Sequence, residues 1–225
     1  MIKKIILLTL ISFMFACQQE QDNFHIDATI DSNYNNKKVT IYRMEKRNKI
    51  VLDSAIVKDG KFTFDGKVDL IDAYALRVDS IRGMLPVIME NANMTIEIYA
   101  DSIYASKITG SKENDITNIY KDKTKAYSRL NKKLIMRSKD SLTHRNEIIG
   151  IRASYDSLMQ VVKGFNKEFI ADYNDSAFSV FTLERMVYNK QISKEVALKL
   201  YEKLSDKMKN LRSAKETLKY INEKM

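Results

Sequence analysis

The chain has 225 residues, a formal net charge of +9, one cysteine and two histidines. A single thiol excludes a disulfide bond within the chain. The length is sufficient for one large domain or two small ones.

The chain starts with a segment typical of exported proteins. Lys3 and Lys4 precede an apolar run over residues 5–15, and the small residue Ala16 follows. A transmembrane helix needs about 20 apolar residues, so this run is too short to remain as a membrane span. We therefore expect residues 1–16 to be a signal peptide that is removed on export.

The residues before Cys17 resemble the lipobox of bacterial lipoproteins. In that motif an aliphatic residue, a small residue and then Gly, Ala or Ser precede the cysteine that is lipidated. Met14, Phe15 and Ala16 hold these places, Phe15 being bulkier than the family norm. We expect Cys17 to carry palmitate-type chains, which together anchor firmly because each buried CH₂ contributes about 0.8 kcal/mol. The alternative is an ordinary signal peptide with a chance cysteine nearby.

The residue after Cys17 bears on the destination of the protein. In lipoproteins generally, an Asp at this place retains the protein in the inner membrane, whereas this chain has Gln18. We therefore expect a location in the cell envelope at the outer membrane, facing either the periplasm or the cell surface. Residues 17–23 are expected to form the lipidated N-terminus and a tether.

Residues 24–110 alternate between apolar and polar side chains, and turn residues interrupt the alternation. This period of two is typical of half-buried strands. Phe24, Ile26, Ala28 and Ile30, for example, share one face. Seven or eight short strands with brief connections predict a largely antiparallel β-sandwich.

Three details of this region predict local geometry. Residues 51–68 read as two strands that a tight turn at Asp59-Gly60 joins into a hairpin. Pro86 lacks an N–H for a strand ladder, so its strand is expected at a sheet edge or is interrupted there. Residues 102–110 are expected to form the last strand.

From Ser111 onward the apolar period becomes helical, and two stripes predict two long antiparallel helices joined near residues 138–142. The first stripe consists of Ile116, Ile119, Tyr120, Tyr127, Leu130 and Leu134, and the second of Ile148, Tyr155, Leu158, Val162, Phe165 and Phe169. Leu158, Val162 and Phe165 are expected to be buried, with Lys163 on the opposite face. Three shorter helices are expected over residues 176–189, over residues 193–209 and from a capping box at Ser213–Glu216. The chain is thus expected to be an α+β protein, with a β-sandwich domain over 24–110 and a helical domain over 111–225.

The charge changes at the same boundary. Residues 18–110 hold 12 basic and 14 acidic residues, whereas residues 111–225 hold 24 and 15. The excess concentrates in residues 121–152, with 10 basic and 3 acidic residues. Contact with an anionic surface is one interpretation, and a solvated helix face is the other, which we favour because basic residues fall on several faces. Nucleic acid is not an expected partner of an exported lipoprotein.

The side chains that usually carry catalysis or metal binding are sparse. His25 and His144 lie in different halves, and neither belongs to a spacing typical of metal ligands. The sequence has neither a glycine-rich phosphate loop nor a G-x-S-x-G elbow. Asp79 and Glu90 could meet across strands, as carboxylates in any strand-rich domain do by chance. We expect no catalytic site, metal or cofactor, and hence no enzyme.

Tyrosine is the enriched aromatic residue, with 12 copies and no tryptophan. Exposed tyrosines can form a binding surface, but more often they cover the edges of a core, which is the interpretation we favour. The tyrosines of the sandwich half are Tyr34, Tyr42, Tyr74, Tyr99 and Tyr104.

Several segments resemble a known family in order along the chain. They are ILLTLISFMFACQQ, LDSAIVKDGKFTFDGKV, MENANMTIEI, ITGSKENDI and FIADYNDSAFSVFTLERM. Together they look like the N-terminal domain of unknown function of thioredoxin-like (AhpC/TSA-TlpA-type) envelope lipoproteins. In that family a β-sandwich and a helical segment precede a disulfide reductase domain with a C-x-x-C motif. This sequence stops at LKYINEKM and resembles a stand-alone form without that domain, so no reductase residue is carried over.

These observations predict a membrane-anchored lipoprotein of the bacterial cell envelope that acts as a non-catalytic binding or interaction module. The alternative is an accessory protein for a separate thioredoxin-like thiol–disulfide redox partner. Both predictions place the protein on a membrane through Cys17 and allow a protein partner. The sequence specifies neither a ligand nor an oligomeric state.

Overall fold

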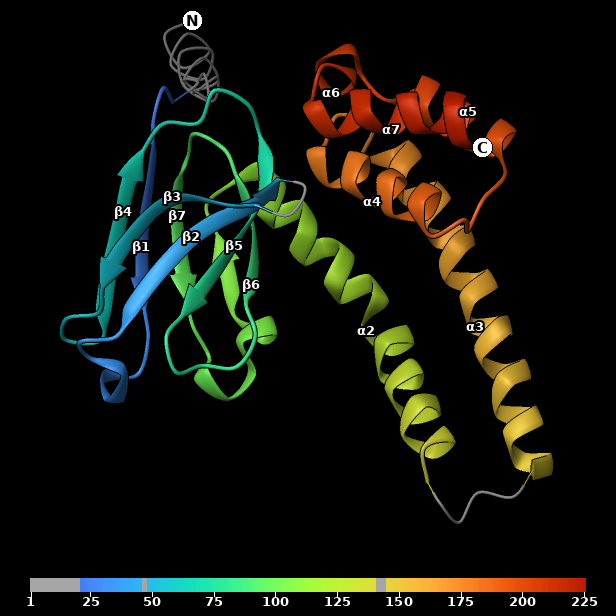
Figure 1. The fold of residues 1–225 in the computed structure, drawn as a ribbon, viewed down its shortest axis with the longest axis horizontal. Helices are drawn as coiled ribbons and strands as arrows, with labels where there is room; N and C mark the ends of the chain where they lie inside the picture. The colour runs from blue at the N-terminus through green and yellow to red at the C-terminus, as the bar shows by residue number, and fades with distance from the viewer. Residues whose placement is uncertain (1–20, 46–47, 141–144) are drawn as a thin grey trace, which may run out of the picture.

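The computed structural model describes residues 21–45, 48–140 and 145–225. Within these ranges the chain forms a β-sandwich, a long helical hairpin and a small helical bundle, in that order (Figure 1). The predicted α+β fold, with a sandwich followed by a helical region, is confirmed. The predictions for residues 1–16, Cys17 and His144 concern positions outside the described residues.

The described strands form two four-stranded sheets. They are β1 (Phe24–Thr29), β2 (Lys38–Glu45), β3 (Asn48–Ile56), β4 (Lys61–Gly66), β5 (Asp72–Val78), β6 (Leu85–Met89), β7 (Asn93–Glu97) and β8 (Lys107–Thr109). The strand order is β4-β1-β7-β8 in the first sheet and β3-β2-β5-β6 in the second. Adjacent strands are antiparallel except β1 and β7, which run parallel, so the first sheet is mixed.

Apolar side chains from the two sheets form the core of the sandwich. Phe24, Ile26 and Ala28 of β1 are buried, as their alternation predicts. Phe64 of β4 and Leu76 of β5 join them in the same cluster. The period-two pattern therefore identified the inward faces correctly.

Asp59 and Gly60 form the predicted tight turn, but they do not join a pair of strands. Both have a positive φ, 50° and 68°, and a Cβ on Gly60 would lie only 2.7 Å from the carbonyl oxygen of Ile30. The strands on either side belong to different sheets, since β3 pairs with β2 and β4 pairs with β1. The hairpin prediction is wrong beyond the turn, because the chain crosses between the two sheets here. The buried Val57 lies at the crossing.

The segment over residues 102–110, predicted as the last strand, is only partly a strand. A 3₁₀ helix, η2 (Ala100–Ala105), covers its first part, and β8 is confined to three residues. The hydroxyl oxygen of Ser106 accepts a hydrogen bond from the backbone N–H of Tyr99 at 3.0 Å. Local bonds of this kind compete with strand pairing. The strand prediction is therefore wrong for residues 102–105.

The strand that contains Pro86 lies at a sheet edge, as predicted, since β6 pairs only with β5 in the second sheet. Its free side is covered at Ile88 by the side chain of Asn114. The amide of Asn114 donates to the Ile88 carbonyl at 2.8 Å and accepts from the Ile88 N–H at 3.2 Å. This amide takes the place of a neighbouring strand, so the edge is not open for pairing at Ile88.

The described helices comprise two long ones and four shorter ones. They are α2 (Lys112–Ser138), α3 (Arg145–Asp172), α4 (Ala177–Tyr188), α5 (Lys194–Lys203), α6 (Asp206–Lys209) and α7 (Arg212–Lys224). Helices α2 and α3 form the predicted antiparallel hairpin, which extends away from both the sandwich and the α4–α7 bundle (Figure 1). No helix in the described ranges combines the length and apolarity required to cross a membrane.

Two predictions for the shorter helices are wrong. Residues 193–209 form two helices, because Ser205 has an extended backbone and its hydroxyl caps α6 by accepting from the Met208 N–H. The capping box at Ser213 and Glu216 is absent, since the residue that precedes α7 is Leu211. The Ser213 hydroxyl instead donates to the carboxylate of Glu184 at 2.5 Å.

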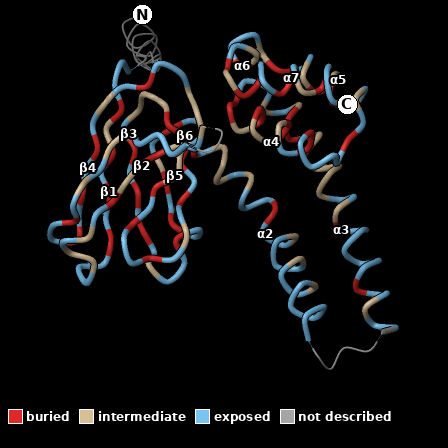
Figure 2. The backbone as a smooth tube through the Cα atoms, in the orientation of Figure 1, coloured by how far each residue is buried: buried red, intermediate tan, exposed pale blue. Residues whose placement is uncertain are grey.

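Most of the outer half of the hairpin is exposed, although Ile151 near the outer end of α3 is buried (Figure 2). Leu158 and Phe169 are buried as predicted, whereas Val162 and Phe165 are only half-buried, as is Lys163 on the face expected to be solvated. Leu130, in the outer half of α2, is 46% exposed. The helical spacing identified the contacting face, but none of the elements in the described ranges forms a third layer over the outer half of the hairpin.

The sandwich and the helical bundle pack against each other. Ile88 of β6 belongs to the apolar cluster of the bundle, and Ile71 packs against that cluster. The carboxylate of Asp72 accepts from Arg43 at 3.1 Å and from Arg212 of α7 at 2.8 Å. These contacts fix the base of the hairpin, so that its outer end projects as an arm.

Candidate functional site

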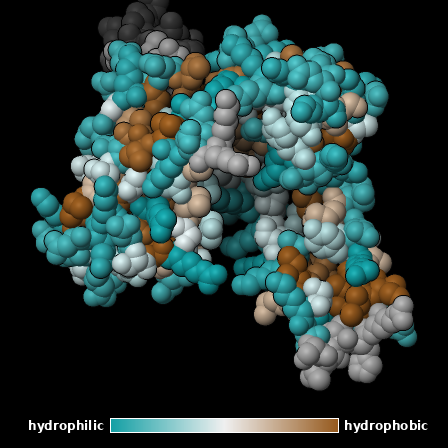
Figure 3. Space-filling view, viewed as in Figure 1, coloured by the Kyte–Doolittle hydropathy of each residue, from teal (hydrophilic) through white to brown (hydrophobic). Residues whose placement is uncertain are grey.

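The outer end of the hairpin exposes large apolar side chains. Met136 is 63% exposed and Ile149 is 61% exposed, and both lie near the end of the arm. Figure 3 shows hydrophobic surface gathered at that end of the hairpin. Contiguous exposed apolar surface on a soluble domain commonly marks a contact site.

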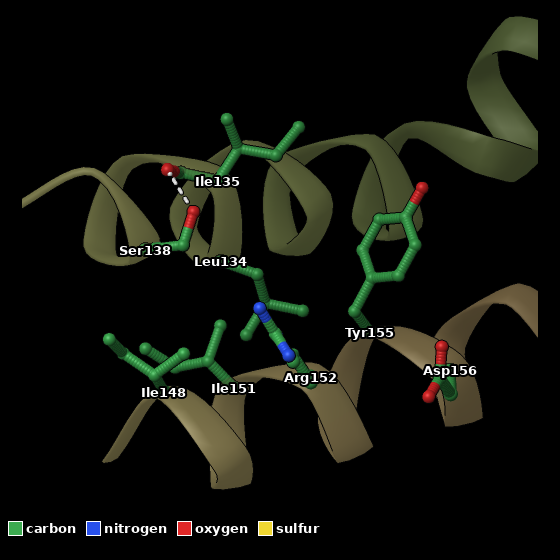
Figure 4. Close-up of a pocket in the computed structure, with 8 residues that line it drawn as sticks. All are labelled: Leu134, Ile135, Ser138, Ile148, Ile151, Arg152, Tyr155 and Asp156. Carbon is green, nitrogen blue, oxygen red and sulfur yellow. Dashed lines mark hydrogen bonds between the residues drawn. The ribbon is translucent and has the colours of Figure 1, made fainter. Parts of the chain in front are cut away.

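A cleft of about 580 Å³ lies within this region, between α2 and α3. In Figure 4, Leu134 of α2 and Ile151 of α3 point toward one another across it, with Arg152 beside them. Ser138 lies at one end of the cleft, and its hydroxyl is occupied by a hydrogen bond to the Ile135 carbonyl at 2.8 Å. The cleft therefore has four aliphatic side chains, and Tyr155, Arg152 and Asp156 complete its wall beside Ser138.

Cations surround the apolar patch. Lys132, Lys133, Lys139 and Arg152 are exposed on the outer half of the hairpin. The guanidinium of Arg137 pairs with the Glu147 carboxylate at 3.3 Å. The tip thus combines an apolar centre with a basic rim, a combination that suits an apolar group surrounded by anions.

His25 lies on the outer face of β1 between two carboxylates. Its Nδ1 is 2.6 Å from Asp65 and its Nε2 is 3.3 Å from Asp27. The hydrogen bond to Asp65 raises the pKa of His25 above its ordinary value, against a smaller effect of burial. The side chain is partly solvated, as expected. No group of three or more metal-binding side chains is found among the described residues.

The sequence allows Asp79 and Glu90 to meet across strands, but the structure does not bring them together. Strands β5 and β6 are antiparallel and pair Asp72 with Met89, so Asp79 and Glu90 follow opposite ends of this two-stranded unit. Glu90 instead accepts a hydrogen bond from the backbone N–H of Glu113 at 2.7 Å. The Glu90 carboxylate therefore binds the backbone at the start of α2.

Glu113 connects the sandwich end of α2 with the start of α4. Its carboxylate is 1% exposed and accepts from the Ser176 hydroxyl at 2.5 Å and from the Phe178 N–H at 3.3 Å. Burial raises the pKa of Glu113, while the hydrogen bond from Ser176 opposes that shift. An acidic residue in the first turn of a helix is a common sequence feature, so no sequence pattern indicated this long-range cap.

The tyrosines of the sandwich take both of the expected roles. Tyr42 is buried, and Tyr34 and Tyr74 pack against the edge of the core. Tyr99 and Tyr104 are exposed and line a groove of about 660 Å³ beside η2 and α2. The prediction that these rings cover core edges is confirmed for the first three.

One family model matches the part of the chain that contains the sandwich. The model described as "Domain of unknown function (DUF4369)" matches residues 24–117. The sandwich and the start of α2 are similar to this family. The match confirms the resemblance to a domain of unknown function over that part of the chain, and the link to thioredoxin-like lipoproteins stays a prediction. A search of curated proteins found no match.

Proposed function

We propose that the protein is a lipoprotein of the bacterial cell envelope, anchored to the outer membrane through Cys17, that binds a protein partner with the tip of its helical hairpin. The observation that carries the proposal is the exposed apolar cleft between Leu134 and Ile151. It lies at the end of an arm whose helices have 27 and 28 residues. At 1.5 Å per residue each helix is about 40 Å long, which places the cleft well away from the sandwich.

The charge of the arm supports a partner of particular chemistry. Residues 121–152 carry 10 basic and 3 acidic residues, and Lys132, Lys133, Lys139 and Arg152 are exposed on the outer half of the hairpin. The best complement is a protein segment with an apolar anchor between carboxylates. Complementary charge speeds encounter and suppresses wrong partners, while the apolar anchor supplies affinity.

Non-catalytic binding accords with the chemistry of the single cysteine. Thiol–disulfide exchange requires attack by a thiolate on a disulfide sulfur. In the proposed lipoprotein the sulfur of Cys17 forms a thioether with lipid, which removes that nucleophile. A role in redox chemistry would then consist of holding a separate thioredoxin-like protein.

Site-specific photo-cross-linking in intact cells tests the proposal. A photoreactive phenylalanine analogue replaces Met136 at the exposed tip, and a matched chain carries it at Thr63, which is exposed on β4 of the sandwich. We expect a discrete protein adduct from position 136 and none from position 63. The substitution Ile149→Asp, within the apolar patch, should reduce the adduct by at least about ten-fold, since it buries a charge in the contact.

The outcomes separate the possible contacts. Capture of a thioredoxin-like protein at position 136 would support the tip contact and assign it to the redox accessory role. Adducts with lipid alone, or equal protein adducts from positions 136 and 63, would contradict a protein-binding tip.

A further inference from the structure

A second pocket, of about 590 Å³, lies at the base of the hairpin. Its walls come from α2, α3, α4 and the loop that follows α4. The residues that line it include Tyr120, Tyr155, Lys163, Asn166, Arg185 and Lys190. None of the residues that line the pocket is acidic.

Three cations converge on this pocket. Lys163 comes from α3, Arg185 from α4 and Lys190 from the loop after α4. Within the described parts of the chain, none of the three forms an ion pair with a carboxylate. Cations that surround a hollow without a compensating carboxylate favour an anion inside it.

The guanidinium of Arg185 is held by a chain of two hydrogen bonds that ends at a buried side chain. Its Nη2 donates to the Tyr120 hydroxyl at 3.2 Å, and that hydroxyl donates to the side-chain oxygen of Asn166 at 2.8 Å. Asn166 is 3% exposed. The Tyr120 ring is fixed in turn by contacts with three aromatic rings, Phe165, Phe169 and Phe178. A guanidinium has five N–H donors, so this anchoring leaves donors for a ligand.

Lys190 occupies a position where glycine or asparagine is usual. It follows the end of α4 with a φ of 53°. Its N–H donates to the Val187 carbonyl, and the Gln191 N–H donates to the Met186 carbonyl at 2.8 Å, the pattern of a Schellman motif. The backbone at Lys190 is thereby fixed, and this residue lines the pocket.

We infer that this pocket binds a phosphate monoester of a small polar molecule such as a sugar. A phosphate monoester carries a charge of about −1.5 to −2 at pH 7 and three acceptor oxygens, which match three cations better than a carboxylate does. The volume lies in the range of about 300–1,000 Å³ typical of small-molecule sites. Gln160 and Gln191 also line the pocket and can bind the hydroxyl groups of such a molecule. This inference does not depend on the anchor or on the contact at the hairpin tip.

Isothermal titration calorimetry on the full-length chain in a non-ionic detergent tests it with four probes: glucose 6-phosphate, inorganic phosphate, glucuronate and glucose. We expect one molecule of glucose 6-phosphate to bind per chain, at least about ten-fold more tightly than glucuronate, and glucose not to bind. Binding should weaken as the salt concentration rises from about 50 to about 500 mM, because salt screens the attraction between the cations and the phosphate. Inorganic phosphate that binds as tightly as glucose 6-phosphate would overturn the sugar part of the inference, and equal binding of glucose would overturn the anion site.

Two variants and a control locate the binding. Arg185→Gln should weaken glucose 6-phosphate binding by about ten-fold or more, because it removes a charged hydrogen bond. The double variant Lys163→Gln/Lys190→Gln should also weaken glucose 6-phosphate binding by about ten-fold or more. It keeps the hydrogen bonds that join Arg185, Tyr120 and Asn166, so a folding defect in one variant does not decide the result. Lys199→Gln makes the same charge change on the exposed face of α5 and should leave binding unchanged. No binding by the wild type, or an equal loss in the Lys199 variant, would overturn the inference.

Discussion

At the residue scale, Glu113 couples the fold to pH. Burial raises the pKa of this carboxyl above its ordinary value of 4.5. The folded chain then holds the proton more tightly than the unfolded chain. The stabilisation that this group supplies is therefore fully present below pH 4.5 and is lost as the pH rises through the raised pKa.

We predict that Glu113→Gln, which resembles the protonated side chain, removes this pH dependence. The free energy of unfolding of the wild type, minus that of the variant, should fall as the pH rises from about 4 to 7. Urea titrations at both pH values measure this difference in the free energy of unfolding. The pKa values of His25 and Glu184 are also raised, but both residues are present in the two chains, so their contributions cancel. The same difference for Glu168→Gln, at an exposed site on α3, should be flat. A Glu113 difference that stayed constant or grew with pH would contradict this role.

At the scale of the elements, the hairpin is firmly packed at its base and loosely packed at its tip. Phe169 is 2% exposed and contacts the rings of Tyr120, Phe165, Tyr173 and Phe178. We predict that Phe169→Ala lowers the free energy of unfolding by about 3–5 kcal/mol. Leu130→Ala, at a half-exposed position on the outer half of α2, should cost less than about 1 kcal/mol. Guanidinium titrations compare the two, and similar losses would show that the arm is packed along its whole length.

The sequence predicted these elements well where burial is decided locally. Alternation identified the inward face of β1, and helical spacing identified α2 and α3, since each pattern reflects one buried side of one element. The turn at Asp59-Gly60 was also visible, because its residue types favour a positive φ. Its flanking strands pair elsewhere because sheet assignment depends on partners distant in the sequence. For the same reason, spacing alone could not show that Leu130 lacks a covering layer.

At the scale of the whole molecule, the candidate sites depend on contacts that no sequence pattern encodes. Glu113 meets Ser176, 63 residues away, and the basic pocket draws Lys163, Arg185 and Lys190 from different elements. The sequence showed the excess of basic residues in the helical half, but it could not show which of them line the same pocket. The hairpin tip lies far from the sandwich, so an anchor at the N-terminus would leave the arm free to reach a partner.

The proposed lipid anchor at Cys17 would determine where that arm operates. The intact mass of the mature protein, purified from the membrane fraction, tests the anchor most directly. We predict a chain that begins at Cys17 and carries the added mass of its acyl chains, and we predict that Cys17→Ser leaves the protein unprocessed or released from the membrane. A mature chain that begins at any other residue, or one that begins at Cys17 without added mass, would contradict the proposed lipoprotein.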